Sequence, residues 1–323
     1  MRYLGLPNLS DQGTAHAPPP GHRRHAPRVS AYRVRDLHHQ PGSRSHQDRQ
    51  ARHGRDQGAH DPEARRRARH GQARHDGLPR PLPVGAAQAQ ENQTWPEYLG
   101  SALADTKPVG TLQQLNIEAI MALKPDLILG SKFRQAAFYD KLAKIAPTVF
   151  TEKVGITWKE NFLLDAEALG KKDQAQQLLT GYETRAKEVG GRFSKLQVGI
   201  VRFMPTEIRL YGPESFSGIV LGDAGIPRPE AQQLADQEDK RFGKISQENV
   251  AKGDADAIFY TAYGEAAAKS QAEITAGPLW KNLKAVEAGH AFNVDDEIWM
   301  TGIGVTAAGK ILDDLDKHLT PLA

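Results

Sequence analysis

The chain has 323 residues, which is enough for two domains or for one large body made of two lobes. It has no cysteine, and this excludes disulfides, thiolate metal sites and a cysteine nucleophile from the sequence. The net charge of +3 is divided unevenly, because residues 1–83 carry +9 and residues 84–323 carry −6. The basic average is therefore no indication that the folded part binds nucleic acid.

Residues 1–83 contain sixteen Arg and ten His but no Lys, and they show almost no apolar periodicity. We expect this segment to be disordered, because it offers little apolar surface to bury. The abrupt change of composition near Pro83 is typical of a GC-rich gene translated out of frame. Two alternatives remain open, namely a genuine basic arm that binds polyanions and a His-rich tail that buffers metal ions.

From residue 84 onward, short apolar runs alternate with helical patterns. Residues 126–130, 197–201 and 257–260 are such runs, each bounded by Gly, Pro or Asp. Strands of this kind are typical of an α/β fold with mainly parallel sheets. The spacing also predicts helices over residues 158–169, 171–193 and 305–319.

An internal repeat indicates two similar lobes. Residues 116–129 align without a gap on residues 246–259. Each copy begins with a helix N-cap residue, Asn116 or Ser246, and has a glutamate two positions later, Glu118 or Glu248. We expect an N-terminal lobe over residues 84–170, a connecting helix over 171–194 and a C-terminal lobe over 195–323. A helix of about 22 residues would span roughly 33 Å and limit hinge motion between the lobes.

The repeated unit, the long helix and the segment 299–315 together resemble the extracytoplasmic iron-siderophore-binding proteins of ABC importers, over about residues 82–319. Segments 129–134, 146–150 and 202–205 are most similar to the hydroxamate and citrate-hydroxamate binders. The resemblance implies a monomeric binding protein, without a cofactor, enzymatic activity or nucleic-acid partner. It would capture a ferric siderophore between its lobes and deliver it to an ABC permease at the cell envelope.

Members of that family begin with a signal peptide, a lipobox cysteine in Gram-positive forms, and a first strand and helix of the N-terminal lobe. Residues 1–10 lack the apolar core of a signal peptide, and the sequence as given has no lipobox cysteine. We therefore expect the N-terminal lobe to lack its first strand and helix.

The chemistry of the ligand predicts which side chains hold it. Residues 84–323 contain two His and no Cys, so we expect iron to arrive already chelated. Direct binding of unchelated iron by Tyr260 and Tyr263 is a minor alternative. An anionic, partly apolar chelate needs cations and aromatic walls near the carboxyl ends of parallel strands. The candidates are Lys132, Arg134, Arg202 and Arg209 as cations, with Trp158, Phe216, Tyr263 and Trp299 as aromatic walls. Each is also a possible surface charge or packing anchor.

The paired glutamates predict a second function. In the family that this chain resembles, a glutamate at the position of Glu118 and of Glu248 docks onto arginines of the permease. The alternative explanation is that each glutamate, in the first turn of its helix, only stabilises the helix dipole. The leading rival to the binding protein is an enzyme that holds a tetrapyrrole or metal cluster on a similar two-lobed scaffold, and polyanion binding by residues 1–83 is a third possibility.

Overall fold

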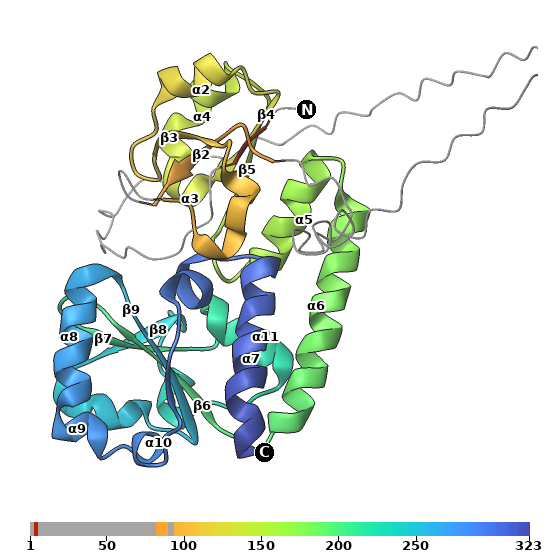
Figure 1. The fold of residues 1–323 in the computed structure, drawn as a ribbon. Helices are drawn as coiled ribbons and strands as arrows, with labels where there is room; N and C mark the ends of the chain where they lie inside the picture. Colours follow the sequence, from red (N-terminus) through yellow and green to blue (C-terminus); the bar gives the residue numbers. More distant parts are fainter. Residues whose placement is uncertain (1–2, 6–81, 90–93) are drawn as a thin grey trace, which may run out of the picture. The chain divides into compact units, whose positions relative to one another are not determined.

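A computed structural model describes the backbone of residues 3–5 and all of residues 82–89 and 94–323. These residues form two five-stranded sheets with their own helices, which confirms the two-lobed α/β fold predicted from the sequence (Figure 1). Most of the basic segment 1–83, and with it the predicted disorder, lies outside the described residues. No described helix is both long and apolar enough to cross a membrane.

The first lobe is built on a sheet with the strand order β3-β2-β1-β4-β5, in which every pairing is parallel. Its strands are β1 (Tyr3–Gly5), β2 (Gly85–Gln88), β3 (Lys107–Thr111), β4 (Leu127–Ser131) and β5 (Thr148–Thr151). Its helices are the 3₁₀ helix η1 (Glu97–Leu103), α2 (Ile117–Leu123), α3 (Lys132–Gln135), the 3₁₀ turn η2 (Ala136–Phe138) and α4 (Tyr139–Ala143). Its apolar core includes Val109, Ile120, Ile128 and Leu142.

The central strand of this sheet corrects one expectation. Leu4 of β1 pairs with Gly85 of β2 on one side and with Ile128 of β4 on the other. The first lobe therefore does not lack its first strand, because Tyr3–Gly5 fills that position. Three residues are too few to show an alternating pattern, so this strand could not be predicted from a sequence pattern. The helix expected to be missing would fall on residues outside the described part.

The second lobe contains a mixed sheet with the order β10-β9-β6-β7-β8. Its strands are β6 (Val198–Phe203), β7 (Ile208–Tyr211), β8 (Phe242–Ile245), β9 (Ala257–Ala262) and β10 (Ala291–Asn293). The strands β6, β9 and β10 are parallel, as predicted, but β7 lies antiparallel to both of its neighbours, β6 and β8. The reason is the short turn 204–207, which returns the chain directly as a hairpin; the Met204 N–H donates to the Glu207 carbonyl at 2.9 Å.

Helices cover both faces of the second sheet. One face packs on α6 (Lys172–Phe193), α7 (Phe216–Ala224) and α11 (Val305–Leu319), and the other packs on the helical elements from η4 (Gln247–Gly253) to α10 (Lys284–Glu287) (Figure 1). The remaining elements are α5 (Trp158–Ala168), η3 (Glu230–Gln232), α8 (Gly264–Ala276), α9 (Pro278–Lys281), the π-helical turn η5 (Glu297–Thr301) and η6 (Thr320–Leu322). The helices predicted over 158–169, 171–193 and 305–319 are thus confirmed as α5, α6 and α11.

The internal repeat forms corresponding elements in the two lobes. The helix α2 and the strand β4 begin at residues 117 and 127, and η4 and β9 begin at residues 247 and 257. The copies differ at their caps. Asn116 Oδ1 accepts a hydrogen bond from the Ala119 N–H at 2.9 Å, whereas Ser246 makes no such cap and its hydroxyl accepts from Asn249 Nδ2 at 3.0 Å. The first copy is an α-helix and the second is a 3₁₀ helix.

Polar contacts join α5, α6 and α7. Lys159 Nζ of α5 lies 2.8 Å from Asp223 Oδ1 of α7 and 3.4 Å from Glu183 Oε1 of α6. The Tyr182 hydroxyl of α6 donates to Asp223 Oδ2 at 2.7 Å. Burial, followed by the charge of Asp223, raises the pKa of Tyr182, so the phenol stays protonated. The three helices are held by a shared network rather than by apolar packing alone.

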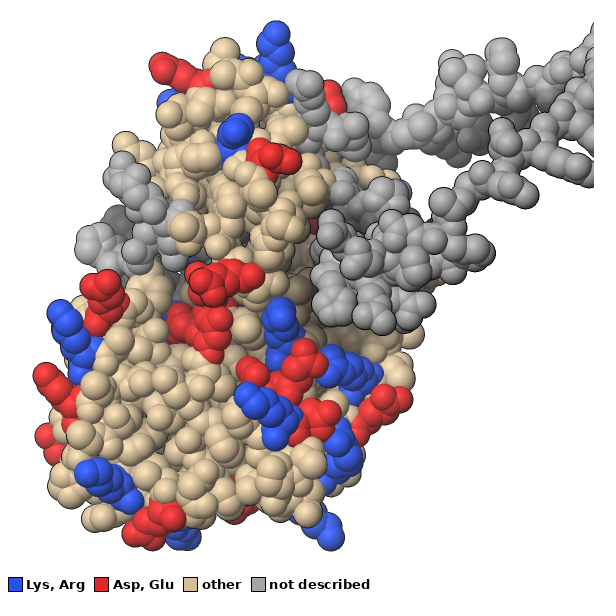
Figure 2. Space-filling view, in the orientation of Figure 1, with Lys and Arg blue, Asp and Glu red and all other residues tan. Residues whose placement is uncertain are grey.

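The outer side of the second lobe carries charges of both signs. Figure 2 shows acidic and basic side chains interspersed over α6 and α11. Arg185 pairs with Asp313, and Arg192 pairs with Asp316 at 2.7 Å. Because these pairs are exposed, each adds little to stability, about 0–1 kcal/mol. The packing between the helices is therefore decided by their buried faces.

The closest approach of α6 and α7 leads to a test of this packing. A Cβ added at Gly190 would lie 1.6 Å from the Ala224 carbonyl oxygen, which is backbone and has no rotamer by which to move away. We expect Gly190→Ala to force the helices apart and to lower the free energy of unfolding by about 3 kcal/mol, measured by urea denaturation. The neighbouring Gly191 has nothing within 4 Å of its added Cβ. Gly191→Ala should leave stability unchanged or raise it by up to about 1 kcal/mol; equal losses in both variants would contradict the tight contact.

Candidate functional site

A row of polar side chains crosses the second sheet near the carboxyl ends of β6 and β9. Ile200 of β6 lies in the core beneath α6, α7 and α11, so the two-residue period of a strand puts Arg202 on that same face. The pairing register places Arg209 opposite Arg202, Lys244 opposite Arg209, and Thr261 beside Arg202. We call Arg202, Arg209 and Lys244 the cationic row.

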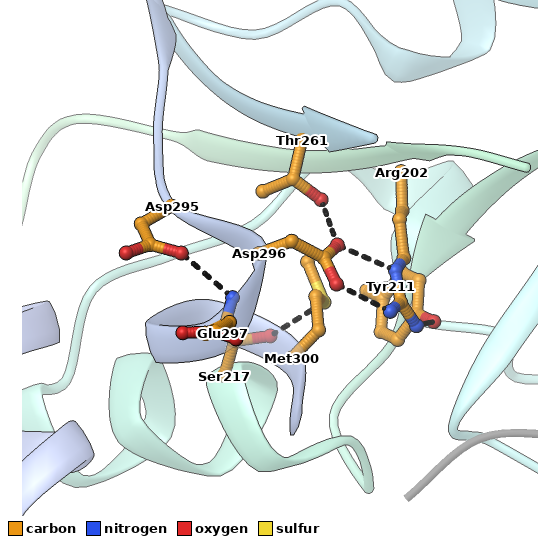
Figure 3. A network of polar contacts seen from close by, with 8 residues as sticks. All are labelled: Arg202, Tyr211, Ser217, Thr261, Asp295, Asp296, Glu297 and Met300. Carbon is orange, nitrogen blue, oxygen red and sulfur yellow. Dashed lines mark hydrogen bonds and ion pairs between the residues drawn. The ribbon is translucent and has the colours of Figure 1, made fainter. Parts of the chain in front are cut away.

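Arg202 has no exposed surface and is fully paired (Figure 3). Its Nε donates to Asp296 Oδ1 at 2.7 Å, and its Nη2 donates to Asp296 Oδ2 at 2.6 Å. Its Nη1 donates to the Tyr211 hydroxyl at 3.0 Å, and its guanidinium lies 4.8 Å from the ring centroid of Tyr263. Burial opposes the charge on Arg202, but the interactions with Tyr211 and Asp296 outweigh burial and raise its pKa.

Arg209 and Lys244 share a single carboxylate. Arg209 Nε donates to Glu207 Oε1 at 2.6 Å, and Lys244 Nζ lies 2.9 Å from Glu207 Oε2. The guanidinium of Arg209 also stacks over Phe242, 4.2 Å from its ring centroid. Partial burial would raise the pKa of Glu207, but the hydrogen bonds from Lys244 and Arg209 outweigh it and lower that pKa. The carboxylates of Asp296 and Glu207 thus lie against the cations of the row.

A small cavity adjoins this row. It is lined by Val154, Gly155, Tyr211, Glu214, Ser215, Phe216, Ser217, Arg241, Phe242, Trp299 and Met300. Its volume of about 20 Å³ holds about one water molecule, so a chelate would require the lining residues to move. A larger hollow of about 440 Å³ lies around Asp254 and His290, at the amino ends of the strands. That end of a parallel sheet is the less favoured place for a ligand.

The four aromatic candidates occupy different settings. Trp158 and Phe216 are buried and contact each other edge to face, with 5.7 Å between ring centroids. Trp299 is fully buried, stacks on Phe259 at 4.6 Å, and donates its indole N–H to Asp314 at 2.8 Å. The fourth, Tyr263, lies against Arg202. Phe216 and Trp299 border the cavity, but a contact of any of these rings with a ligand stays a prediction.

The other cationic candidates, Lys132 and Arg134, follow β4 in the first lobe. Lys132 Nζ pairs with Glu152 at 2.9 Å in an exposed ion pair. The guanidinium of Arg134 lies 5.7 Å from the ring centroid of Phe133. Phe133 itself is 61% exposed. The four cations thus form two groups, one at the carboxyl end of each sheet.

Sequence reasoning missed several residues of this arrangement. Phe133 stands in the predicted ligand loop, and its neighbours Lys132 and Arg134 were a usable signal. Tyr211 follows Arg209 by two residues on β7, so strand alternation places both on one face. Asp296 gave no signal, because it is 94 residues away from Arg202 in the sequence.

Two further predictions concern metal and docking. Among the described residues, no group of three or more His, Asp or Glu side chains is arranged to hold a metal ion. Tyr260 packs on Trp280 on the opposite face of the sheet from Tyr263, so the structure does not bring the two tyrosines together.

Glu118 and Glu248 are both exposed in the first turn of their helices. The Glu248 carboxylate accepts hydrogen bonds from its own backbone N–H and from the Ser246 side chain, and these lower the pKa of Glu248.

Comparison with known proteins agrees with this architecture. The chain belongs to the periplasmic binding protein family, which it matches over residues 84–298. It is 39% identical to the probable siderophore-binding lipoprotein YfiY of Bacillus subtilis, over 73% of this chain and 76% of that protein. It is 28% identical to the Fe(3+) dicitrate-binding periplasmic protein FecB of Escherichia coli, over 75% of this chain and 80% of that protein.

Solved structures give the same result. The crystal structure of Staphylococcus aureus SirA matches with a TM-score of 0.64 and 32% identity, over 74% of this chain and 92% of SirA. The structure of SirA complexed with staphyloferrin B matches with a TM-score of 0.65 and 32% identity, over 73% of this chain and 86% of SirA in that structure. The predicted relationship to siderophore-binding proteins is confirmed, and so is the prediction of a binding protein rather than an enzyme.

The buried ion pair in this site leads to a stability prediction. Asp296→Ala would leave the Arg202 guanidinium charged, buried and without its carboxylate, so we expect a loss of about 3–5 kcal/mol in the free energy of unfolding. Asp239 pairs with Arg241 at 2.7 Å in an exposed setting, so Asp239→Ala should cost no more than about 1 kcal/mol. Urea denaturation of both variants checks this. Similar small losses in the two variants would mean that Arg202 finds another partner or water.

Proposed function

We propose that this chain captures a ferric siderophore and delivers it to an ABC permease for iron uptake. The observation that carries the proposal is the cationic row on the carboxyl side of β6 and β9, next to a cavity with aromatic walls. The relatives support it, since YfiY is named as a probable siderophore-binding protein and FecB as a ferric dicitrate-binding protein.

The chemistry of the site fits a chelate better than free iron. Guanidinium and ammonium groups bind the acidic oxygens of a chelate, and aromatic rings pack against its apolar parts. Within the described residues the only histidines are His290 and His318, and His318 stacks on Phe292 at 4.4 Å. We propose a hydroxamate or citrate-hydroxamate siderophore as the ligand, held by the predicted cations and aromatic residues of both lobes.

The proposal includes a place and a mode of action. Because the relatives are named as lipoproteins and periplasmic proteins, we place the functional protein outside the cytoplasm, associated with the cell envelope. It would act as a monomer, with residues 84–170 and 195–323 as the lobes and residues 171–194 as the connection. The exposed acids Glu118 and Glu248 would contact the two permease subunits, one from each lobe.

A titration tests ligand capture. We expect intrinsic tryptophan fluorescence of the purified chain to be quenched saturably by at least one ferric siderophore in a panel of hydroxamate, citrate-hydroxamate, carboxylate and catecholate types. Arg134→Ala should then reduce the binding free energy of the tightest-binding siderophore by about 1.5–3 kcal/mol, the range for hydrogen bonds to charged groups. Lys187→Ala, which removes an exposed cation from the far part of α6, is the matched control and should bind normally. No saturable quenching by any ferric siderophore would contradict the proposed function.

Transport tests the docking role. We expect a Glu118→Arg/Glu248→Arg double variant to keep its siderophore affinity within about twofold but to lose uptake, because like charges would face the permease arginines. The double variant Glu167→Arg/Glu188→Arg changes two other exposed glutamates and should transport normally. Uptake would be measured with ⁵⁵Fe-loaded siderophore in a strain that retains the permease but lacks its own binding protein. Normal uptake by the Glu118/Glu248 variant would rule out these contacts.

A further inference from the structure

Three of the four cations assigned to ligand binding already pair with carboxylates of the protein. Lys132 pairs with Glu152, Arg202 pairs with Asp296, and Glu207 bridges Arg209 and Lys244. An anionic chelate that approaches these cations must therefore compete with carboxylates of the protein itself. The three carboxylates differ in how readily they give way.

Two of them are poor candidates for such competition. The pair of Lys132 with Glu152 is more than half exposed on both sides, so water already screens it and its loss changes little. Asp296 accepts two hydrogen bonds from Arg202 and a third from the Thr261 hydroxyl at 2.7 Å (Figure 3). Its removal would leave Arg202 buried and uncompensated, so Asp296 is a fixed part of the fold.

Glu207 contacts two cations of the row, and its side chain lies in a turn where it can rotate. It belongs to the turn 204–207 between β6 and β7, where its backbone carbonyl is held by Met204 while its side chain is 22% exposed. Its carboxylate touches Arg209, which is nearly buried, and Lys244, which is 59% exposed. A partly buried charge interacts more strongly than an exposed one, and a turn side chain that borders solvent can rotate without disturbing a strand.

We propose that Glu207 is a specificity-determining residue whose carboxylate holds, between Arg209 and Lys244, a position that an acidic oxygen of an anionic ferric chelate takes on binding. This inference rests on the proposed function. The displaced carboxylate stays near the bound anion and repels it, so Glu207 weakens the binding of anionic chelates. A chelate without net charge neither competes with Glu207 nor is repelled by it. Glu207 therefore sets the charge of the ligands that the site accepts.

The test replaces the carboxylate by an amide of the same shape. In Glu207→Gln, the amide oxygen still accepts a hydrogen bond from Arg209, but the negative charge is lost. The probes are ferric citrate, which is anionic, and a neutral ferric trihydroxamate, each titrated by tryptophan fluorescence. We expect ferric citrate to bind about tenfold more tightly to the variant than to the original chain, with a steeper dependence on salt. The affinity for the neutral chelate should change by less than about twofold.

Two control variants isolate the effect of charge at this position. Glu207→Asp retains a carboxylate on a shorter side chain and should give no comparable gain. Glu167→Gln removes an exposed carboxylate that pairs with Lys172 on the surface, and should leave both affinities unchanged. Equal unfolding midpoints of the variants would show that the comparison is made on intact folds.

The outcomes separate the inference from the proposed function. If the original chain binds a ferric chelate but Glu207→Gln gains nothing for ferric citrate, or gains equally for both probes, the inference is wrong and siderophore capture stands. If the variant binds ferric citrate and the original chain does not, the inference is supported in its strongest form. If neither protein binds any ferric chelate, both ideas fall.

Discussion

The ion pair between Arg202 and Asp296 is the interaction on which the arrangement of the second lobe depends. A guanidinium without exposed surface is stable only where carboxylate and hydroxyl groups replace the water that it has lost. Arg202 of β6 donates to Tyr211 of β7 and to Asp296, the residue just before η5, and Asp296 accepts a further hydrogen bond from Thr261 of β9. The pair therefore joins three strands to the turn that carries Trp299 and Met300, and it fixes the wall of the cavity as well as the end of the sheet.

Much of the fold could be predicted from local patterns. Apolar runs and three- and four-residue spacing identified β4, β6, β9, α5, α6 and α11, because burial of one face imposes a regular period. Two features could not be predicted from local patterns. The strand β1 has three residues, too few for a pattern, and the reversed direction of β7 depends on the short turn at 204–207 rather than on strand composition.

The site was predictable in its residue types but not in its pairing. Strand ends indicated where Arg202 and Arg209 would lie, and the register puts them side by side on one face. The sequence did not show that Arg202 already has a carboxylate, because Asp296 comes from a distant segment, whereas the carboxylate of Arg209 is Glu207, only two residues away. Trp299 illustrates the same limit, since a loop aromatic in the sequence is a fully buried ring stacked on Phe259 in the structure. Pairing and burial are tertiary properties, and local periodicity carries no information about them.

The network of Lys159, Asp223 and Tyr182 has a mechanical consequence. It attaches α5 to α6 and α7 from the second residue of α5 onward, so the long helix that we propose as the connection is also tied to α7 of the second lobe. We therefore expect bending between the lobes to fall on the few residues ahead of Trp158, where Gly155 has a φ of 81°. Gly155 also borders the cavity, so bending there would reshape the rim of the proposed binding site.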